Sequence, residues 1–401
     1  MSLGHEIAAA RPRVIAALAA QLRDLDLAEE AHDAAVEALL AQAGEVRDVA
    51  AWLYVAARRK ALDLLRKRKA EQRWSSEAMA GTEPMAEIIE LPDPIPDERL
   101  RLIFICCHPA IAPEARVALA LRIVCGVSVE AIAGAFLLNP AAMYQRITRS
   151  KAKIRLAGVP FETPGRREWP ERVEAVLATL EIAYAVAYRE AADQSDLAEL
   201  REEVVRLSAL LAELLPAEAE ALGMHALVLL ASSRSRARVD AGGAMVPLSQ
   251  QDTDLWDHEA ISRARIQLDR AAELGAPGPV QLLAAIHLVH AKRSRTGETD
   301  WETIVRLYDR LALLRPTAVV GINRAVAIGR WRSGEEGLAA LAELDAGKLE
   351  GFLPFHVARA DLLARAGQLS NAKDEYRSAL AAGPGGAERR WIAQQLAALG
   401  D

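Results

Sequence analysis

Basic and amide side chains gather between residues 140 and 155 of this 401-residue chain, in a stretch without acids. From Ala131 to Phe161 five cations occur and no Asp or Glu: Arg146, Arg149, Lys151, Lys153 and Arg155. Glutamine and arginine can each form two hydrogen bonds to a base edge, so Gln145 and Arg149 are candidates for base contacts. The cations further along suit phosphate groups, which position a protein without reading sequence. This pattern favours contact with DNA.

These side chains need a helix to present them, and residues 126–155 predict two helices joined by a short turn. Ser128 is a suitable N-cap for the first helix, while Asn139 and Pro140 suit the start of the second. Helical spacing predicts one buried stripe on each helix, with these members: Val129, Ile132, Ala133, Phe136, Met143, Ile147 and Ile154.

In a helix-turn-helix, the N-terminal part of the second helix meets the base edges. The outward positions there are Ala142, Tyr144, Gln145, Thr148 and Arg149. Lys151, Lys153 and Arg155 lie further along and are predicted to hold phosphates. The alternative is a solvated amphipathic helix in an all-α domain. Spacing alone does not distinguish these two interpretations.

A second basic cluster follows Trp52 and runs from Arg58 to Arg73. Trp52, Val55, Leu62 and Leu65 keep a helical spacing, which predicts a buried face opposite a strongly positive one. Trp52 and Tyr54 could stack on unstacked bases. The alternative places Trp52 in the core, where aromatic residues at helical spacing usually pack.

Composition predicts an all-α chain of two to four domains, because apolar residues make up 52% of it and Ala and Leu dominate. No apolar run is long enough to span a membrane, and the N-terminus lacks the features of a signal peptide. Three cysteines do not form a disulfide framework. We therefore expect a cytoplasmic protein without membrane contact.

The net charge of −6 is unevenly divided between the two parts of the chain. Residues 1–170 carry 23 Lys or Arg and 22 Asp or Glu, a balance of +1, which leaves −7 for residues 171–401. The overall acidity therefore does not argue against nucleic acid, because local clustering decides such binding.

No residue set for catalysis was found, since the chain lacks a Gly-rich phosphate loop, a His-Glu-x-x-His motif and a nucleophile elbow. We expect a non-enzyme without a cofactor. Cys106, Cys107, His108 and Cys125 invite a zinc hypothesis. Adjacent cysteines on a helix point about 100° apart, and the apolar neighbours suit buried thiols, so a metal is not expected.

Two basic helices with an acidic helix before the first resemble the two conserved domains of a bacterial sigma factor of the extracytoplasmic-function class. The matching stretches begin at Leu27-Ala28-Glu29-Glu30 and at Trp52-Leu53-Tyr54-Val55, and the likeness continues through Pro96-Asp97-Glu98-Arg99 and the helix-turn-helix. The sequence resembles the subgroup of this class that carries a long tetratricopeptide-like extension. This likeness covers nearly the whole chain.

The resemblance implies three binding surfaces. The family's polymerase-binding acids correspond here to Glu29, Glu30, Asp33 and Glu37. Its minus-10 contacts correspond to Trp52, Arg58, Arg59, Lys60 and Arg66. Its minus-35 contacts correspond to Tyr144, Gln145, Thr148 and Arg149, with Lys151 and Lys153 added as phosphate contacts.

The implied organisation has five segments. Residues 1–72 form sigma region 2, 73–97 a linker rich in proline and acids, and 98–158 sigma region 4. Residues 159–170 form a second linker, and 171–401 a helical extension. In this extension the spacing of Ala372, Tyr376, Ala379 and Pro384 matches a tetratricopeptide second helix. The same offsets recur at Ile304, Tyr308, Leu311 and Pro316, and more weakly at Val204, Ser208, Leu211 and Pro216, which predicts a solenoid.

One irregular loop, residues 240–257, interrupts the helical pattern. Five of its positions match the Leu-x-x-Gln-Asp-x-x-x-Trp-Asp signature of the subgroup: Leu248, Gln251, Asp252, Trp256 and Asp257. A regulatory contact or ligand pocket is one interpretation of this loop. The other is that Trp256 and Asp252 pin the loop onto the helices and the sigma domains.

The sequence therefore predicts a transcription initiation factor that binds core RNA polymerase and promoter DNA. Contact between the sigma domains and the extension, or a ligand or protein partner of the extension, would regulate it. The alternative is a helix-turn-helix regulator with a ligand- or peptide-binding solenoid that does not bind polymerase.

Overall fold

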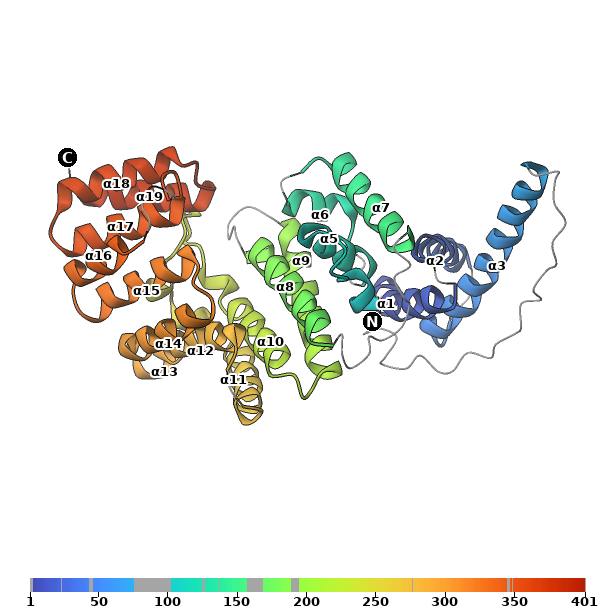
Figure 1. Cartoon of the computed structure of the whole chain (residues 1–401), viewed down its shortest axis with the longest axis horizontal. Coiled ribbons are helices and arrows are strands. Elements are labelled where there is room, and N and C mark those ends of the chain that lie inside the picture. Colours follow the sequence, from blue (N-terminus) through green and yellow to red (C-terminus); the bar gives the residue numbers. More distant parts are fainter. Residues whose placement is uncertain are drawn as a thin grey trace. The chain divides into compact units, whose positions relative to one another are not determined.

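The chain is all-helical, as predicted, and divides into two compact units, Met1–Ala183 and Tyr184–Asp401. The computed structural model describes residues 3–22, 24–42, 46–75, 102–124, 127–136, 138–156, 169–188, 195–275, 277–344, 347 and 349–400 (Figure 1). Within these ranges the β-structure amounts to an isolated bridge between Val239 and Met245. None of the described helices is both long and apolar enough to cross a membrane.

Three helices open the first unit: α1 (Leu3–Leu22), α2 (Leu25–Leu40) and α3 (Val49–Ser75). Each packs on the other two. The Asp24 carboxylate caps α2 by accepting hydrogen bonds from the backbone N–H groups of Asp26 and Leu27, at 2.9 and 3.1 Å. Their shared core is apolar and includes Ile15, Leu18, Leu27 and Leu53.

The buried face of α3 differs from the predicted one. Val55 and Leu62 were expected inside but are 47% and 40% exposed. The buried residues are Val49, Leu53, Ala57 and Ala61, which follow a spacing of four. Two alanines on this face let α1 and α2 approach α3 closely, so small side chains rather than large ones mark the interior.

The second group of helices in this unit begins with a helical turn at residues 102–106 and continues with α5 (Pro113–Ile123), α6 (Val129–Ala135) and α7 (Pro140–Leu156). The prediction of two helices joined by a turn is confirmed for α6 and α7. The Asn139 carboxamide oxygen accepts a hydrogen bond from the backbone N–H of Ala141 at 2.8 Å, as expected of a cap. Met143, Ile147 and Ile154 form the buried stripe of α7, together with Ser150.

Cys106 and Cys107 are buried and unbridged, and burial raises the pKa of the Cys107 thiol to about 11. Thr179 lies within hydrogen-bonding reach of that thiol. It belongs to α8 (Trp169–Tyr188), so the first part of this helix packs with the first unit although the extension was predicted to begin at residue 171. Among the described residues no three His, Cys, Asp or Glu side chains are arranged to hold a metal ion. Cys125, and most of the predicted linkers 73–97 and 159–170, lie outside the described residues.

The second unit is a succession of helices, each packed mainly on its neighbours in the chain. They are α9 (Ser195–Leu214), α10 (Ala219–Ser232), α11 (His258–Glu273), α12 (Pro279–Ala291), α13 (Arg293–Thr296), α14 (Trp301–Leu314), α15 (Ala318–Trp331), α16 (Gly334–Ala342), α17 (Leu353–Arg365), α18 (Leu369–Ala381) and α19 (Gly386–Ala398). The helical positions of the predicted repeat lie inside: Ala372, Tyr376, Ala379, Ile304, Leu311, Val204, Ser208 and Leu211 are buried and Tyr308 is half-buried.

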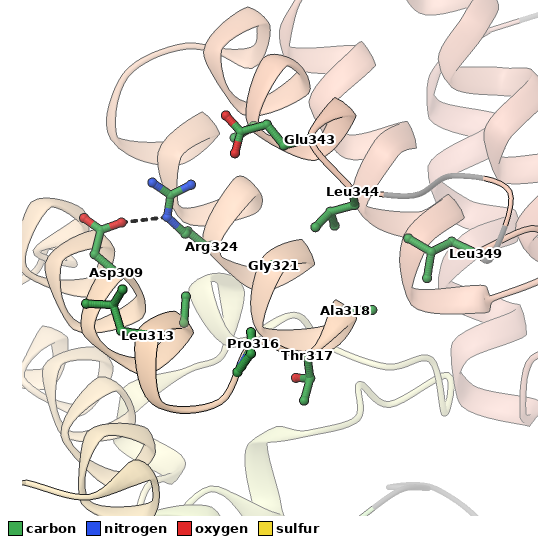
Figure 2. Close-up of a pocket in the computed structure, with 12 residues that line it drawn as sticks. Asp309, Leu313, Pro316, Thr317, Ala318, Gly321, Arg324, Glu343, Leu344 and Leu349 are labelled. Atoms are coloured by element: carbon green, nitrogen blue, oxygen red, sulfur yellow. Dashed lines mark hydrogen bonds and ion pairs between the residues drawn. The ribbon is translucent and has the colours of Figure 1, made fainter.

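A groove of about 690 Å³ lies along α14, α15 and α16 (Figure 2). Leucine, alanine and proline side chains form most of its wall. Its one ion pair joins Arg324 Nε to an Asp309 carboxylate oxygen at 2.6 Å, and Glu343 also lines it. The charges that line this groove therefore include both signs.

The revised face of α3 can be tested by two substitutions two residues apart. Leu53→Ala removes a side chain that is fully buried and should lower the free energy of unfolding by about 2–5 kcal/mol. Val55→Ala, at the position predicted to be inside, should change it by less than about 0.5 kcal/mol. Urea denaturation followed by circular dichroism gives both values. Equal decreases in the free energy of unfolding would show that Val55 is buried as first predicted.

Candidate functional site

The outward face of α7 carries the predicted base-reading side chains. Tyr144 is 65% exposed, and Ala142, Gln145, Thr148 and Arg149 are exposed with it. Arg149 Nε donates to the backbone carbonyl of Gln145 at 3.3 Å, so the guanidinium lies along the helix surface beside that residue. Lys153 is exposed further along. The structure thus brings the predicted set together on one open surface.

Lys151 is the exception, because it turns away from this surface toward α2. Its side chain is only 12% exposed, and its ammonium group donates to Asp26 at 3.0 Å and to Glu29. Burial alone would lower the pKa of Lys151, but the charge and hydrogen bond of Glu29, followed by those of Asp26, outweigh burial and raise it. Lys151 therefore stays charged and paired, and a DNA phosphate would have to displace these carboxylates.

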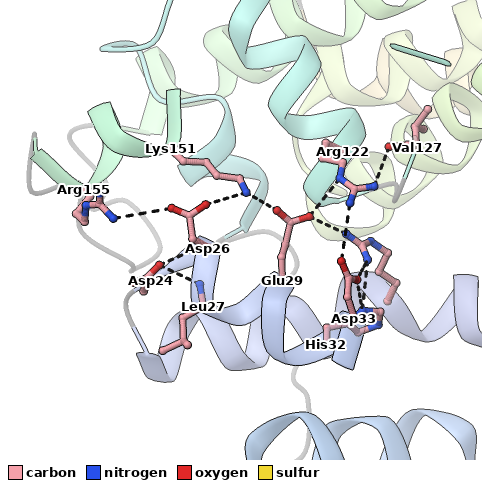
Figure 3. A network of polar contacts seen from close by, with 11 residues as sticks. Asp24, Asp26, Leu27, Glu29, His32, Asp33, Arg122, Val127, Lys151 and Arg155 are labelled. Carbon is pink, nitrogen blue, oxygen red and sulfur yellow. Dashed lines mark hydrogen bonds and ion pairs between the residues drawn. The ribbon is translucent and has the colours of Figure 1, made fainter. Parts of the chain in front are cut away.

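Glu29 is the centre of this network (Figure 3). Its carboxylate accepts from Arg11 Nη2 of α1 at 2.7 Å and from Lys151 of α7, and Arg122 Nε of α5 lies 3.4 Å away. The Glu29 side chain is only 9% exposed. One buried anion thus holds cations from three helices, two of them in the second helical group.

Asp33 and Asp26 extend the network on either side of Glu29. Arg11 Nη1 donates to Asp33 at 2.9 Å, and Arg155 lies 3.9 Å from Asp26. Burial raises the pKa of Asp33, but the hydrogen bonds from His32 and Arg11 and the charge on Arg11 reverse this and lower it to about 2. Asp33 is therefore ionised at any pH near neutral.

The predicted polymerase-binding acids do not form one open surface. Glu30 and Glu37 are exposed and the Asp33 side chain is 51% exposed, whereas Glu29 is buried. Arg11 and Arg122 were not predicted as partners of these acids. A signal for Arg11 exists, because it occupies a buried position in an alanine-rich helix, where an arginine normally requires a carboxylate.

The predicted minus-10 residues lie along α3. Arg59, Lys60 and Arg66 are exposed, while Arg58 and Trp52 are half-buried. Arg66 forms a loose surface ion pair with Asp63 at 3.5 Å. The side chains of the cluster from Arg68 onward lie outside the described residues.

The loop of residues 240–257 is anchored at several points, which supports the interpretation that it is pinned to helices. Trp256 is 3% exposed, and Arg293 lies over its ring at 5.3 Å from the centroid. Arg293 Nη2 also donates to the backbone carbonyl of Gln251 at 2.6 Å. Asp257 caps α11 by accepting from the backbone N–H of Ala260 at 2.9 Å, and Asp252 caps the short turn Thr253–Leu255.

Leu248 and Gln251, the other two predicted loop residues, are also held by local contacts. Leu248 begins the short turn Leu248–Gln250, and its backbone carbonyl accepts from Arg293 at 3.2 Å. Gln251 is buried, and its Nε2 donates to the backbone carbonyl of Val246 at 3.1 Å. Each of the five residues therefore has a local structural task within the second unit.

The fold and these surfaces define an all-helical protein of two compact units, the first of which joins an acidic helix to a basic one through buried ion pairs. Residues 172–272 match a family model described as a family of unknown function (DUF6596). A protein of Rhizobium meliloti (strain 1021), named Uncharacterized protein R00370, is 40% identical over 399 residues, which cover 97% of this chain and 94% of the relative. The chain belongs to the family of this rhizobial protein.

The central role of Glu29 gives a stability prediction. Glu29→Gln leaves three neighbouring cations without their shared anion, and breaking a buried ion pair in this way costs about 3–5 kcal/mol. Glu37→Gln on the same helix is the matched control, because its side chain is exposed and should change the free energy of unfolding by less than about 0.5 kcal/mol. Thermal and urea denaturation measure both, and equal effects would contradict the assignment of Glu29 as the centre of the network.

Proposed function

We propose that this chain is a sigma factor of the extracytoplasmic-function class, which binds core RNA polymerase and directs it to promoters. The observation that carries the proposal is the outward face of α7. It presents Tyr144, Gln145, Thr148 and Arg149 at the start of the second helix of a helix-turn-helix, on a helix without an acidic residue. This is the geometry with which such motifs read the major groove, and here it would read the minus-35 element.

The α3 helix supports the proposal as the second DNA contact. Its exposed side carries Arg59, Lys60 and Arg66, and the half-buried Trp52 and Arg58 lie on the same helix. A positive helix with an aromatic residue near its start suits a partly single-stranded minus-10 element, because cations follow the backbone and an aromatic ring stacks on a base. Two modest contacts on one promoter then add in free energy.

The acids of α2 supply the proposed polymerase surface. Their ion pairs couple this surface to the DNA-binding face of α7. Glu30, Asp33 and Glu37 are accessible, whereas Glu29 is occupied by Lys151, Arg11 and Arg122. Core polymerase that engages Glu29 must separate it from Lys151. Lys151 is then free for a promoter phosphate, so polymerase binding and minus-35 binding favour each other.

The second unit would act as a regulatory extension of the tetratricopeptide-like kind. Support comes from the packing of its helices on their neighbours in the chain and from the buried positions of the repeat. Because it is covalently attached, even a weak contact with the sigma domains would operate at a high effective concentration. The proposed location is the cytoplasm, where polymerase is found.

A second candidate function is a helix-turn-helix regulator that binds DNA without polymerase. The burial of Glu29 favours it, because a carboxylate that is fully paired within the chain is not available to a partner. In this case the α2 acids serve only to hold α5 and α7 in place.

Core binding decides between the two functions. The full chain should co-elute with bacterial core RNA polymerase in size-exclusion chromatography, and the complex should start transcription from a matched promoter. Glu30→Gln combined with Glu37→Gln should weaken the complex, because it removes two exposed charges from the proposed surface. Glu273→Gln, an exposed acid on α11, is the control. Lack of any core binding by the unmodified chain would leave only the second candidate.

Two substitutions on α7 separate base reading from phosphate contact. Arg149→Ala should cost about 1–3 kcal/mol on the preferred minus-35 sequence and little on others, since it removes a paired contact to one base. Lys153→Ala should weaken binding to all sequences alike and reduce the salt slope by about 1. Fluorescence anisotropy at several salt concentrations measures both effects, and a uniform loss with Arg149→Ala would exclude it from base reading.

A further inference from the structure

The second unit contains two arginines, one buried and one half-buried, that no carboxylate among the described residues balances. Arg234, at the end of α10, is 4% exposed and donates through Nη2 to His287 Nδ1 at 2.7 Å and through Nε to the backbone carbonyl of Leu230 at 3.0 Å. Arg238 donates to the backbone carbonyl of Tyr188 at 2.9 Å and lies over the Tyr188 ring at 5.2 Å. Among the described residues neither guanidinium has a carboxylate within ion-pair distance.

Among the described residues, the side chains in contact with these arginines include the Tyr188 phenol and the His287 imidazole. Tyr184 and Tyr188 of α8 stack at 5.1 Å between ring centroids, and burial raises the pKa of both phenols. Burial and the charge of Arg234 lower the pKa of His287 well below its usual value and that of His290 to about 3. At neutral pH both imidazoles are therefore uncharged and both phenols keep their protons.

This arrangement contrasts with two paired cations of the first unit. Lys151 and Arg11 in the first unit each meet a carboxylate, as buried charges normally must because their desolvation is costly. Burial likewise lowers the pKa of Arg234 to about 10, which reflects a guanidinium that lacks a compensating anion. The two guanidinium groups thus have no carboxylate partner among the described residues.

Part of this cluster is exposed to solvent. Tyr184, Arg238, His287 and His290 are half-buried rather than closed off. They come from α8, from the segment after α10 and from α12, and α12 packs directly on α10 (Figure 1). This half-buried cluster differs from the groove along α14 to α16, where Arg324 already has a carboxylate.

We propose that Arg234 and Arg238, with Tyr184, Tyr188 and His287 around them, form a binding site for the oxyanion group of a small molecule, a phosphate or a carboxylate. Guanidinium groups bind such groups through paired, charge-assisted hydrogen bonds, and the protonated phenols can add further donors. The site gives the extension a ligand of defined chemistry. It does not rest on the proposed function, because it lies wholly in the second unit and its test involves neither polymerase nor DNA.

The test measures the melting temperature of the full chain as inorganic phosphate is added, with acetate as the carboxylate probe and sodium chloride at equal ionic strength as the baseline. The melting temperature of the unmodified chain should rise along a saturating curve. Arg234→Gln and Arg238→Gln should each weaken the apparent affinity about tenfold or more. Arg236→Gln is the matched control, because its side chain is exposed on the turn between the two arginines. The probe that saturates at the lower concentration identifies the group that the site prefers.

The melting curves of these variants distinguish binding at a specific site from a general effect of salt. Phosphate also stabilises proteins nonspecifically, but that effect does not saturate and would act equally on all variants. Equal curves for the unmodified chain and Arg234→Gln would therefore overturn the proposal, as would the same loss with Arg236→Gln. Far-UV circular dichroism shows whether each variant folds. If Arg234→Gln fails to fold, Arg238→Gln, whose side chain is half-buried, decides alone.

Discussion

A single buried carboxylate joins the two helical groups of the first unit. Glu29 meets Arg11 from α1, Arg122 from α5 and Lys151 from α7, so helices more than a hundred residues apart in sequence share one anion. Apolar packing alone would allow the two helical groups to slide, because dispersion has no direction. Hydrogen bonds from Arg11 and Lys151, with the ion pair to Arg122, fix both position and orientation. Because Glu29 of α2 pairs with Lys151 of α7, a change at the surface of one helix also affects the surface of the other.

Helix positions could be predicted from the sequence where local chemistry sets them. Asn139 and Pro140 mark the start of α7, and the stripe of Met143, Ile147 and Ile154 correctly predicts which side of α7 is buried. The face of α3 was predicted wrongly, because the spacing rule weighed large side chains and the interior is marked by Ala57 and Ala61. Alanine tolerates both environments, so only the approach of α1 and α2 decides its burial.

In the candidate site, too, features set by local sequence could be predicted, whereas contacts between distant residues could not. The exposed set on α7 follows from helical periodicity, whereas the pairing of Lys151 with Glu29 joins residues 122 positions apart and leaves no local trace. The unbalanced arginines of the second unit are equally hidden in the sequence. Arg234 looks like any basic residue near a helix end until α8 and α12 enclose it. The role of a charged residue that depends on a distant partner can be assigned only from the tertiary structure.

The loop of residues 240–257 is tied to the last helix of the chain, since the backbone N–H of Met245 donates to Ala387 at 3.0 Å and Arg390 donates to the backbone carbonyl of Gly243 at 2.9 Å. A row of helices that touch only their neighbours can fold or fray one segment at a time. A contact that spans more than 140 residues raises the contact order and couples distant segments. The second unit should therefore unfold as one cooperative body, with α19 fastening a loop that precedes α11.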